Sequence, residues 1–163
     1  MKTTKLMSRM ALVSALALTG LNVNAATVTD NLAVSATVIA NCSIDAATTP
    51  LAFGNYDAIV ANKTTPKDMA ASVDVTCTNG ATGVTLSAGN GTSFSAGVRH
   101  MTKAADILAY ELYSDAGRTT AFAAEPVTAD GTAQTLDVYG RIPAAETAPV
   151  GAYTDTVVMT VTF

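Results

Sequence analysis

Side chains suited to catalysis or metal binding are scarce in this 163-residue chain, which has no tryptophan, one histidine and two cysteines. A Ser-His-Asp triad would have to use His100, whose neighbours contain no nucleophile motif. A zinc site needs more ligands than two cysteines and one distant histidine can supply. The acidic residues form no compact pair, and no glycine-rich phosphate loop is present. We therefore expect neither an enzyme nor a bound cofactor or metal.

Long apolar runs are also lacking, apart from one near the start, over residues 10–21. Three basic residues precede this run, and "VNA" follows it with small residues at Val23 and Ala25. This order is typical of a secretory signal peptide. A retained membrane anchor is the alternative, but the run is short for a bilayer. The pattern predicts a leader over residues 1–25 and an exported mature chain.

Positive charge is scarce in the mature chain, which has six basic and thirteen acidic residues and a formal charge of −7. Without a basic cluster, nucleic acid is not an expected partner. Cys42 and Cys77 are the only cysteines. In an exported protein they are predicted to form one disulfide.

What the mature chain does contain is short stretches of alternating apolar and polar residues between turn signals such as Asn79-Gly80 and Asp130-Gly131. Strands are predicted at 51–56, 71–78, 84–88, 107–113, 133–142 and 153–163. A helix over 101–113 is the alternative reading of one stretch, but alternation favours a strand in its second half. This spacing indicates an all-β antiparallel sandwich.

Both ends of the mature chain have a one-sided apolar pattern. The first segment, 26–38, is interrupted at Asp30, and the last, 153–163, at Asp155. The N-terminal apolar face comprises Val28, Leu32, Val34, Ala36 and Val38. The C-terminal face comprises Tyr153, Val157, Met159, Val161 and Phe163. The N-terminal strand could pair with the C-terminal strand of its own chain or with that of a neighbour, and the pattern leaves both open.

Several stretches together resemble the spore coat protein U family, which includes subunits of archaic, Csu-type chaperone–usher pili. They are "LAFGNYD", "VDVTCTNG", "LAYELYSDAGRT", "VYGRIPA" and the terminal "GAYTDTVVMTVTF". The resemblance implies an incomplete immunoglobulin-like β-sandwich that is completed by a donated strand. It also implies a structural subunit, shaft or minor pilin, that polymerises by donor-strand exchange and supports adhesion and biofilm formation.

On this interpretation residues 26–38 are a donor-strand arm and residues 39–163 are the pilin domain. The donor residues are the N-terminal face, and the C-terminal face borders the acceptor groove and contacts the chaperone. The implied partners are a periplasmic pilus chaperone, an outer-membrane usher and neighbouring pilin subunits, with the protein passing through the periplasm to a cell-surface pilus. The alternatives are a self-contained secreted β-sandwich binding module and a spore or cell coat protein that forms no pilus.

Overall fold

The computed structural model describes residues 25–163, so the predicted leader lies outside the described residues except for Ala25. A compact unit begins at Thr37 and runs to Phe163. In the described part of the chain, secondary structure consists of β-strands, and no helix there is long and apolar enough to cross a membrane.

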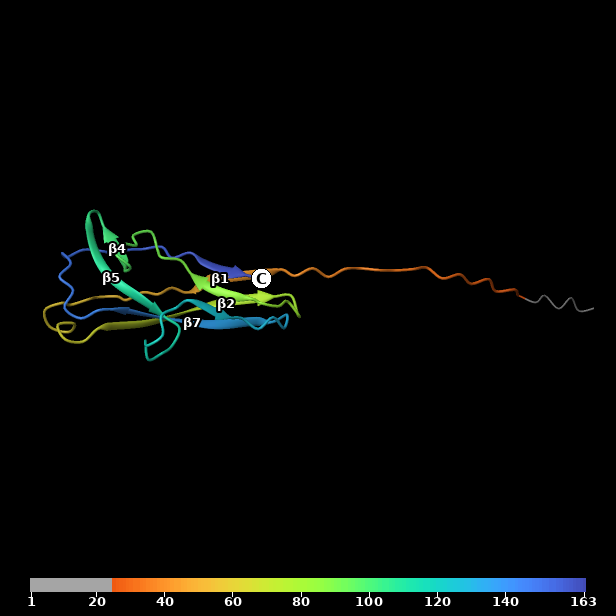
Figure 1. Ribbon diagram of the computed structural model, residues 1–163, viewed down its shortest axis with the longest axis horizontal. Coiled ribbons are helices and arrows are strands. Elements are labelled where there is room, and N and C mark those ends of the chain that lie inside the picture. The colour runs from red at the N-terminus through yellow and green to blue at the C-terminus, as the bar shows by residue number, and fades with distance from the viewer. Residues whose placement is uncertain (1–24) are drawn as a thin grey trace, which may run out of the picture. The chain divides into compact units, whose positions relative to one another are not determined.

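Within residues 25–163, eight strands, all paired antiparallel, build two sheets. One sheet has the order β1-β2-β7-β5-β4 and the other the order β6-β3-β8. Figure 1 shows β2 and β7 side by side in the larger sheet. The strands are β1 (Cys42–Thr49), β2 (Lys67–Cys77), β3 (Thr85–Ala88), β4 (Arg99–Lys103), β5 (Asp106–Tyr113), β6 (Ala124–Pro126), β7 (Ala133–Ile142) and β8 (Met159–Thr162).

Alternation along the strands creates the core. In β2, Val73, Val75 and Cys77 are buried, while the residues between them are half-buried. In β5, Leu108, Tyr110 and Leu112 point into the same core. Because strand side chains alternate between faces, one face of each strand supplies the interior. The predicted all-β antiparallel sandwich is therefore confirmed, and the helical reading of 101–113 is wrong because β4 and β5 pair there.

Two predicted strands differ from the structure. Residues 51–56 form no ladder, because Gly54 has a positive φ of 65° that interrupts a regular strand. The last strand is shorter than 153–163: only β8 forms a ladder, because its partner β3 ends at Ala88. Earlier in this segment a single bridge joins Thr154 to Thr102 of β4. The alternating pattern did not predict β1, β4 or β6.

Candidate functional site: an open apolar groove

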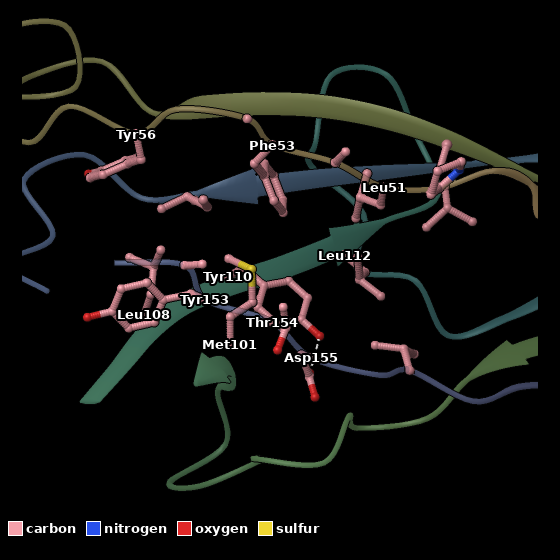
Figure 2. Close-up of a pocket in the computed structure, with 18 of the residues that line it drawn as sticks. Leu51, Phe53, Tyr56, Met101, Leu108, Tyr110, Leu112, Tyr153, Thr154 and Asp155 are labelled. Atoms are coloured by element: carbon pink, nitrogen blue, oxygen red, sulfur yellow. Dashed lines mark hydrogen bonds between the residues drawn. The ribbon is translucent and has the colours of Figure 1, made fainter. Parts of the chain in front are cut away.

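An apolar groove of about 1010 Å³ lies along one side of the sandwich. One wall is the extended segment 50–56, and the other is the C-terminal segment up to Met159. Figure 2 shows Phe53 and Tyr56 on one side, with Tyr153 and Asp155 on the other. Core side chains line the bottom: Val73, Leu108, Tyr110, Leu112, Val138 and Ile142. The sandwich is thus incomplete where core residues border an open groove.

The backbone of the C-terminal wall presents unused pairing capacity to this groove. Thr154 exchanges both backbone hydrogen bonds with Thr102, at 2.9 and 3.1 Å, and the Val158 carbonyl accepts from the Gly89 N–H at 2.8 Å. Successive residues of an extended chain direct their N–H and C=O groups to opposite sides. The backbone groups of Asp155, Val157 and Met159 therefore face the groove, where a further strand can pair with them.

The opposite wall is held by a close approach to β7. A Cβ atom on Gly140 would lie 2.6 Å from Cδ2 of Leu51 and 2.8 Å from Cζ of Phe53, so only glycine leaves room for these side chains. The Phe53 ring also meets Tyr110 edge-on, with the ring centroids 6.3 Å apart. At the end of the segment, the Tyr56 hydroxyl donates to the Pro143 carbonyl at 2.6 Å and accepts from the Glu146 N–H.

One carboxylate interrupts the apolar lining. Asp155 accepts hydrogen bonds from the Tyr110 hydroxyl at 2.5 Å and from the Thr92 N–H at 2.8 Å and hydroxyl at 2.5 Å. Burial works against ionisation of Asp155, but the bonds from Thr92 and Tyr110 outweigh it and lower the pKa of the carboxyl. Burial, reinforced by the bond to Asp155, raises the pKa of Tyr110. The pair is therefore an ionised carboxylate and a neutral phenol at neutral pH.

The "SDAGRT" stretch has a structural role beside β5. Oδ1 of Asp115 accepts from the N–H groups of Thr119 and Thr120, which closes the loop. Within this loop Arg118 adopts a φ of 56° and donates to the carbonyls of Met69 and Gly140 at 3.0 and 3.1 Å. The loop thereby fastens β5 to the paired strands β2 and β7.

The start of the sandwich is covalently fixed. Cys42 and Cys77 form the predicted disulfide, with an S–S distance of 2.13 Å between the first residue of β1 and the last residue of β2. Next to it, the Thr78 N–H donates to the Asn41 carbonyl at 2.9 Å, and the Thr78 hydroxyl accepts from the Asn41 N–H at 3.1 Å. The chain is therefore anchored at Asn41, three residues after Val38.

The structure places the predicted site residues as follows. On the C-terminal side, Tyr153, Val157, Met159 and Val161 are half-buried against the core, whereas Phe163 is 54% exposed. Only Tyr153, Val157 and Met159 of this set line the groove. The large side chains of the N-terminal face are 83% to 93% exposed: Val28, Leu32, Val34 and Val38. Ala36 is exposed as well.

The second wall and most of the floor of the groove were not predicted from the sequence. Leu51 and Phe53 were placed in a strand, with no indication that their segment borders an opening. The signal that was available is the "LAFG" spacing, which puts two large apolar residues on one face just before a glycine. In the part of the chain that the structure describes, no group of three or more His, Cys, Asp and Glu residues is placed to hold a metal ion.

These features define a class of protein, a β-sandwich that is one strand short along an apolar groove. The family model of the Spore Coat Protein U domain matches residues 28–160, and the chain belongs to this family. Its members are structural proteins, in agreement with the expectation of a non-enzyme. Protein U of Myxococcus xanthus is 37% identical over 156 residues, which cover 85% of this chain and 87% of that protein.

A solved structure has the same fold. It is the crystal structure of the CsuC–CsuE chaperone–tip adhesion subunit pre-assembly complex from the archaic chaperone–usher Csu pili of Acinetobacter baumannii. The TM-score is 0.52 at 22% sequence identity, over 78% of this chain. The match spans 40% of the length of the solved chain. At this identity the likeness concerns the fold.

Proposed function

We propose that this protein is a structural subunit of an archaic chaperone–usher pilus, a shaft or minor pilin, which polymerises by donor-strand exchange. The observation that carries the proposal is the apolar groove of about 1010 Å³, bordered by core residues and by backbone groups able to accept a strand. Such strand addition is the recurring way in which a sheet edge binds an extended peptide, and chaperone–pilin complementation is among its known examples.

The occupant proposed for the groove is the arm, residues 26–38, of the next copy. Its apolar face is Val28, Leu32, Val34, Ala36 and Val38, and the domain that receives it is residues 39–163. Burying the leucine and three valines contributes about 6–12 kcal/mol gross, before the cost of ordering the arm is subtracted. Pairing also covers an open sheet edge that would otherwise favour aggregation. Because donor and acceptor are different surfaces, the contact is head-to-tail and propagates as a fibre.

The likeness to a chaperone-bound pilus subunit supports the same interpretation for the route to the surface. On this proposal the leader directs the chain to the periplasm, where a chaperone fills the groove until an outer-membrane usher exchanges it for an arm. The C-terminal side of the groove, with Tyr153, Val157, Met159, Val161 and Phe163, is then the surface shared by chaperone and neighbour. The assembled fibre serves adhesion and biofilm formation.

A matched pair of arm variants tests the proposal. Leu32→Asp places a charge on the apolar face of the arm, whereas Ala33→Asp places the same charge on the opposite face. We expect the mature wild-type chain and the Ala33→Asp variant to form polymers that resist dissociation in cold SDS. Leu32→Asp should give folded, disulfide-bonded single subunits. Equal polymer from both variants would contradict the proposal.

A second candidate is a coat protein that assembles on a surface without forming a pilus. It is favoured by the family description, which names a spore coat, and by the 37% identity to Protein U. Electron microscopy of cells that express the protein with a chaperone and usher distinguishes the two: thin fibres support the pilin, and a continuous layer supports the coat. A stable full-length monomer that unfolds when residues 26–38 are deleted would instead indicate a self-contained module.

A further inference from the structure

We propose that the arm occupies the groove of the next copy in one register, antiparallel to the segment 153–159, with Ala36 opposite Asp155. This inference rests on the proposed function and adds to it the alignment of the two strands. It assigns to Asp155 a role that the sequence did not suggest, as the residue that selects which arm position fits beside it.

The lengths of the two partners match. On the C-terminal wall, the positions that line the groove with inward-facing side chains are Tyr153, Asp155, Val157 and Met159. Within the arm, the uninterrupted run of alternating apolar residues is Leu32, Val34, Ala36 and Val38. Ala40 continues the alternation, but it adjoins Asn41, which is held by hydrogen bonds to Thr78. Each set has four members at a spacing of two residues and spans about 20 Å in extended chain. Asp30 lies two residues before Leu32 and on the same face of the arm. The register places it opposite Val161, which does not line the groove.

The direction and the alignment follow from Asp155. Its two carboxylate oxygens are already engaged by Tyr110 and Thr92, so a neighbouring side chain gains nothing there and must not displace these bonds. The position opposite Asp155 therefore favours the smallest side chain of the arm face, which is Ala36. An antiparallel arrangement places it there, whereas the parallel arrangement of the same two segments places Val34 beside the carboxylate.

Shifted alignments are worse. Moving the arm by two residues in one direction puts Asp30 opposite Met159, which buries an unpaired charge in the apolar groove. Moving it by two residues in the other direction puts Val38 opposite Asp155 and carries Leu32 beyond the lined part of the groove. The backbone is also consistent with the proposal, because Asp155, Val157 and Met159 direct their N–H and C=O groups toward the incoming strand.

Engineered disulfides in the mature, full-length chain test the register. In the proposed alignment Ala33 faces Val158 as a non-hydrogen-bonded antiparallel pair, for which the Cα–Cα distance is about 4.5 Å. This distance suits a disulfide. Thr154 lies four residues further along, about 13 Å away. Val158 and Thr154 are exposed in the single chain, and so is Thr156, which lies between them.

We expect the double variant Ala33→Cys/Val158→Cys to give a ladder of covalent oligomers on non-reducing gels, at a rate about tenfold above that of Ala33→Cys/Thr154→Cys. The pair Ala33→Cys/Thr156→Cys should cross-link more weakly than the pair with Val158. The single variants are the controls for mispairing with the native disulfide. A ladder that is strongest at Thr154 would overturn the antiparallel direction, and one that is strongest at Thr156 would overturn the alignment.

The failure of this inference is distinguishable from the failure of the proposed function. Polymer that persists under reducing conditions in cold SDS shows arm exchange whichever cysteine pair reacts. If such polymer forms and cross-links at another pair, the register is wrong and the function stands. If no variant and no wild-type protein forms polymer, both proposals are overturned.

Discussion

Arg118 offers a stringent test of how the sandwich is held together, because its backbone and side chain make opposite contributions to stability. The guanidinium donates to the carbonyls of Met69 and Gly140 and lies 3.4 Å from Asp68. It also lies 5.5 Å from the centre of the Tyr139 ring. At the same time, Arg118 has a φ of 56°. This left-handed backbone conformation costs a residue other than glycine about 1 kcal/mol.

Removing the guanidinium takes a charged hydrogen-bond donor away from the Met69 and Gly140 carbonyls, which lie opposite each other in the β2–β7 ladder. A hydrogen bond from a charged donor contributes about 1.5 kcal/mol, so the loss of two should lower the free energy of unfolding of Arg118→Ala by about 3 kcal/mol. Asp68 does not add to this loss, because Arg141 still donates two hydrogen bonds to it at 2.7 and 2.8 Å. Arg118→Gly removes the same donors but relieves the backbone, so it should be more stable than the alanine variant by about 1 kcal/mol.

Equilibrium unfolding in urea, followed by circular dichroism on the mature chain at a concentration where it is monomeric, measures both differences. The expected order of stability is wild type, then Arg118→Gly, then Arg118→Ala. A loss below about 1 kcal/mol in the alanine variant would refute the role of the guanidinium bonds. A glycine variant less stable than the alanine variant would refute the argument from backbone strain.

Three further perturbations follow from the same structure. Cys77→Ala removes a disulfide that closes a separation of 35 residues, and urea unfolding should show a loss of about 4 kcal/mol; an unchanged midpoint would contradict this. Gly140→Ala forces its Cβ against Phe53 and should cost about 1–3 kcal/mol, and calorimetry that shows no drop in Tm would refute the packing argument. The hydrogen bond from Arg141 holds the pKa of Asp68 below its ordinary 3.8, so its contribution to stability is present above about pH 4 and lost as the pH falls through the folded pKa. Asp68→Asn should therefore flatten the decline of stability below about pH 4 in urea titrations, and an unchanged slope would contradict the assignment.

The strands that could be predicted from the sequence are those in which apolar and polar residues alternate strictly and a turn follows. The pattern from Ala71 to Cys77 is followed by Asn79-Gly80, and β2 forms there. By contrast, β4 (Arg99–Lys103) contains two buried polar residues, Arg99 and His100, so its pattern is not apolar on one face. These polar groups are satisfied by distant carbonyls, Gly89 for the arginine and Ser93 for the histidine, which no local pattern indicates.

The sequence by itself determined the all-β fold class, the disulfide partners and the one-sided apolar faces at the two ends of the mature chain. These depend on local alternation and on the number of cysteines. The open groove was decided only by tertiary structure. It exists because the extended segment with Leu51 and Phe53 packs over Gly140 on one side, while the C-terminal chain continues past the end of β3 on the other. The contact of Tyr110 and Thr92 with Asp155 joins residues 45 and 63 positions apart. Such a juxtaposition depends on the fold of the whole sandwich, which is why a lone aspartate in an alternating strand gave no hint of it.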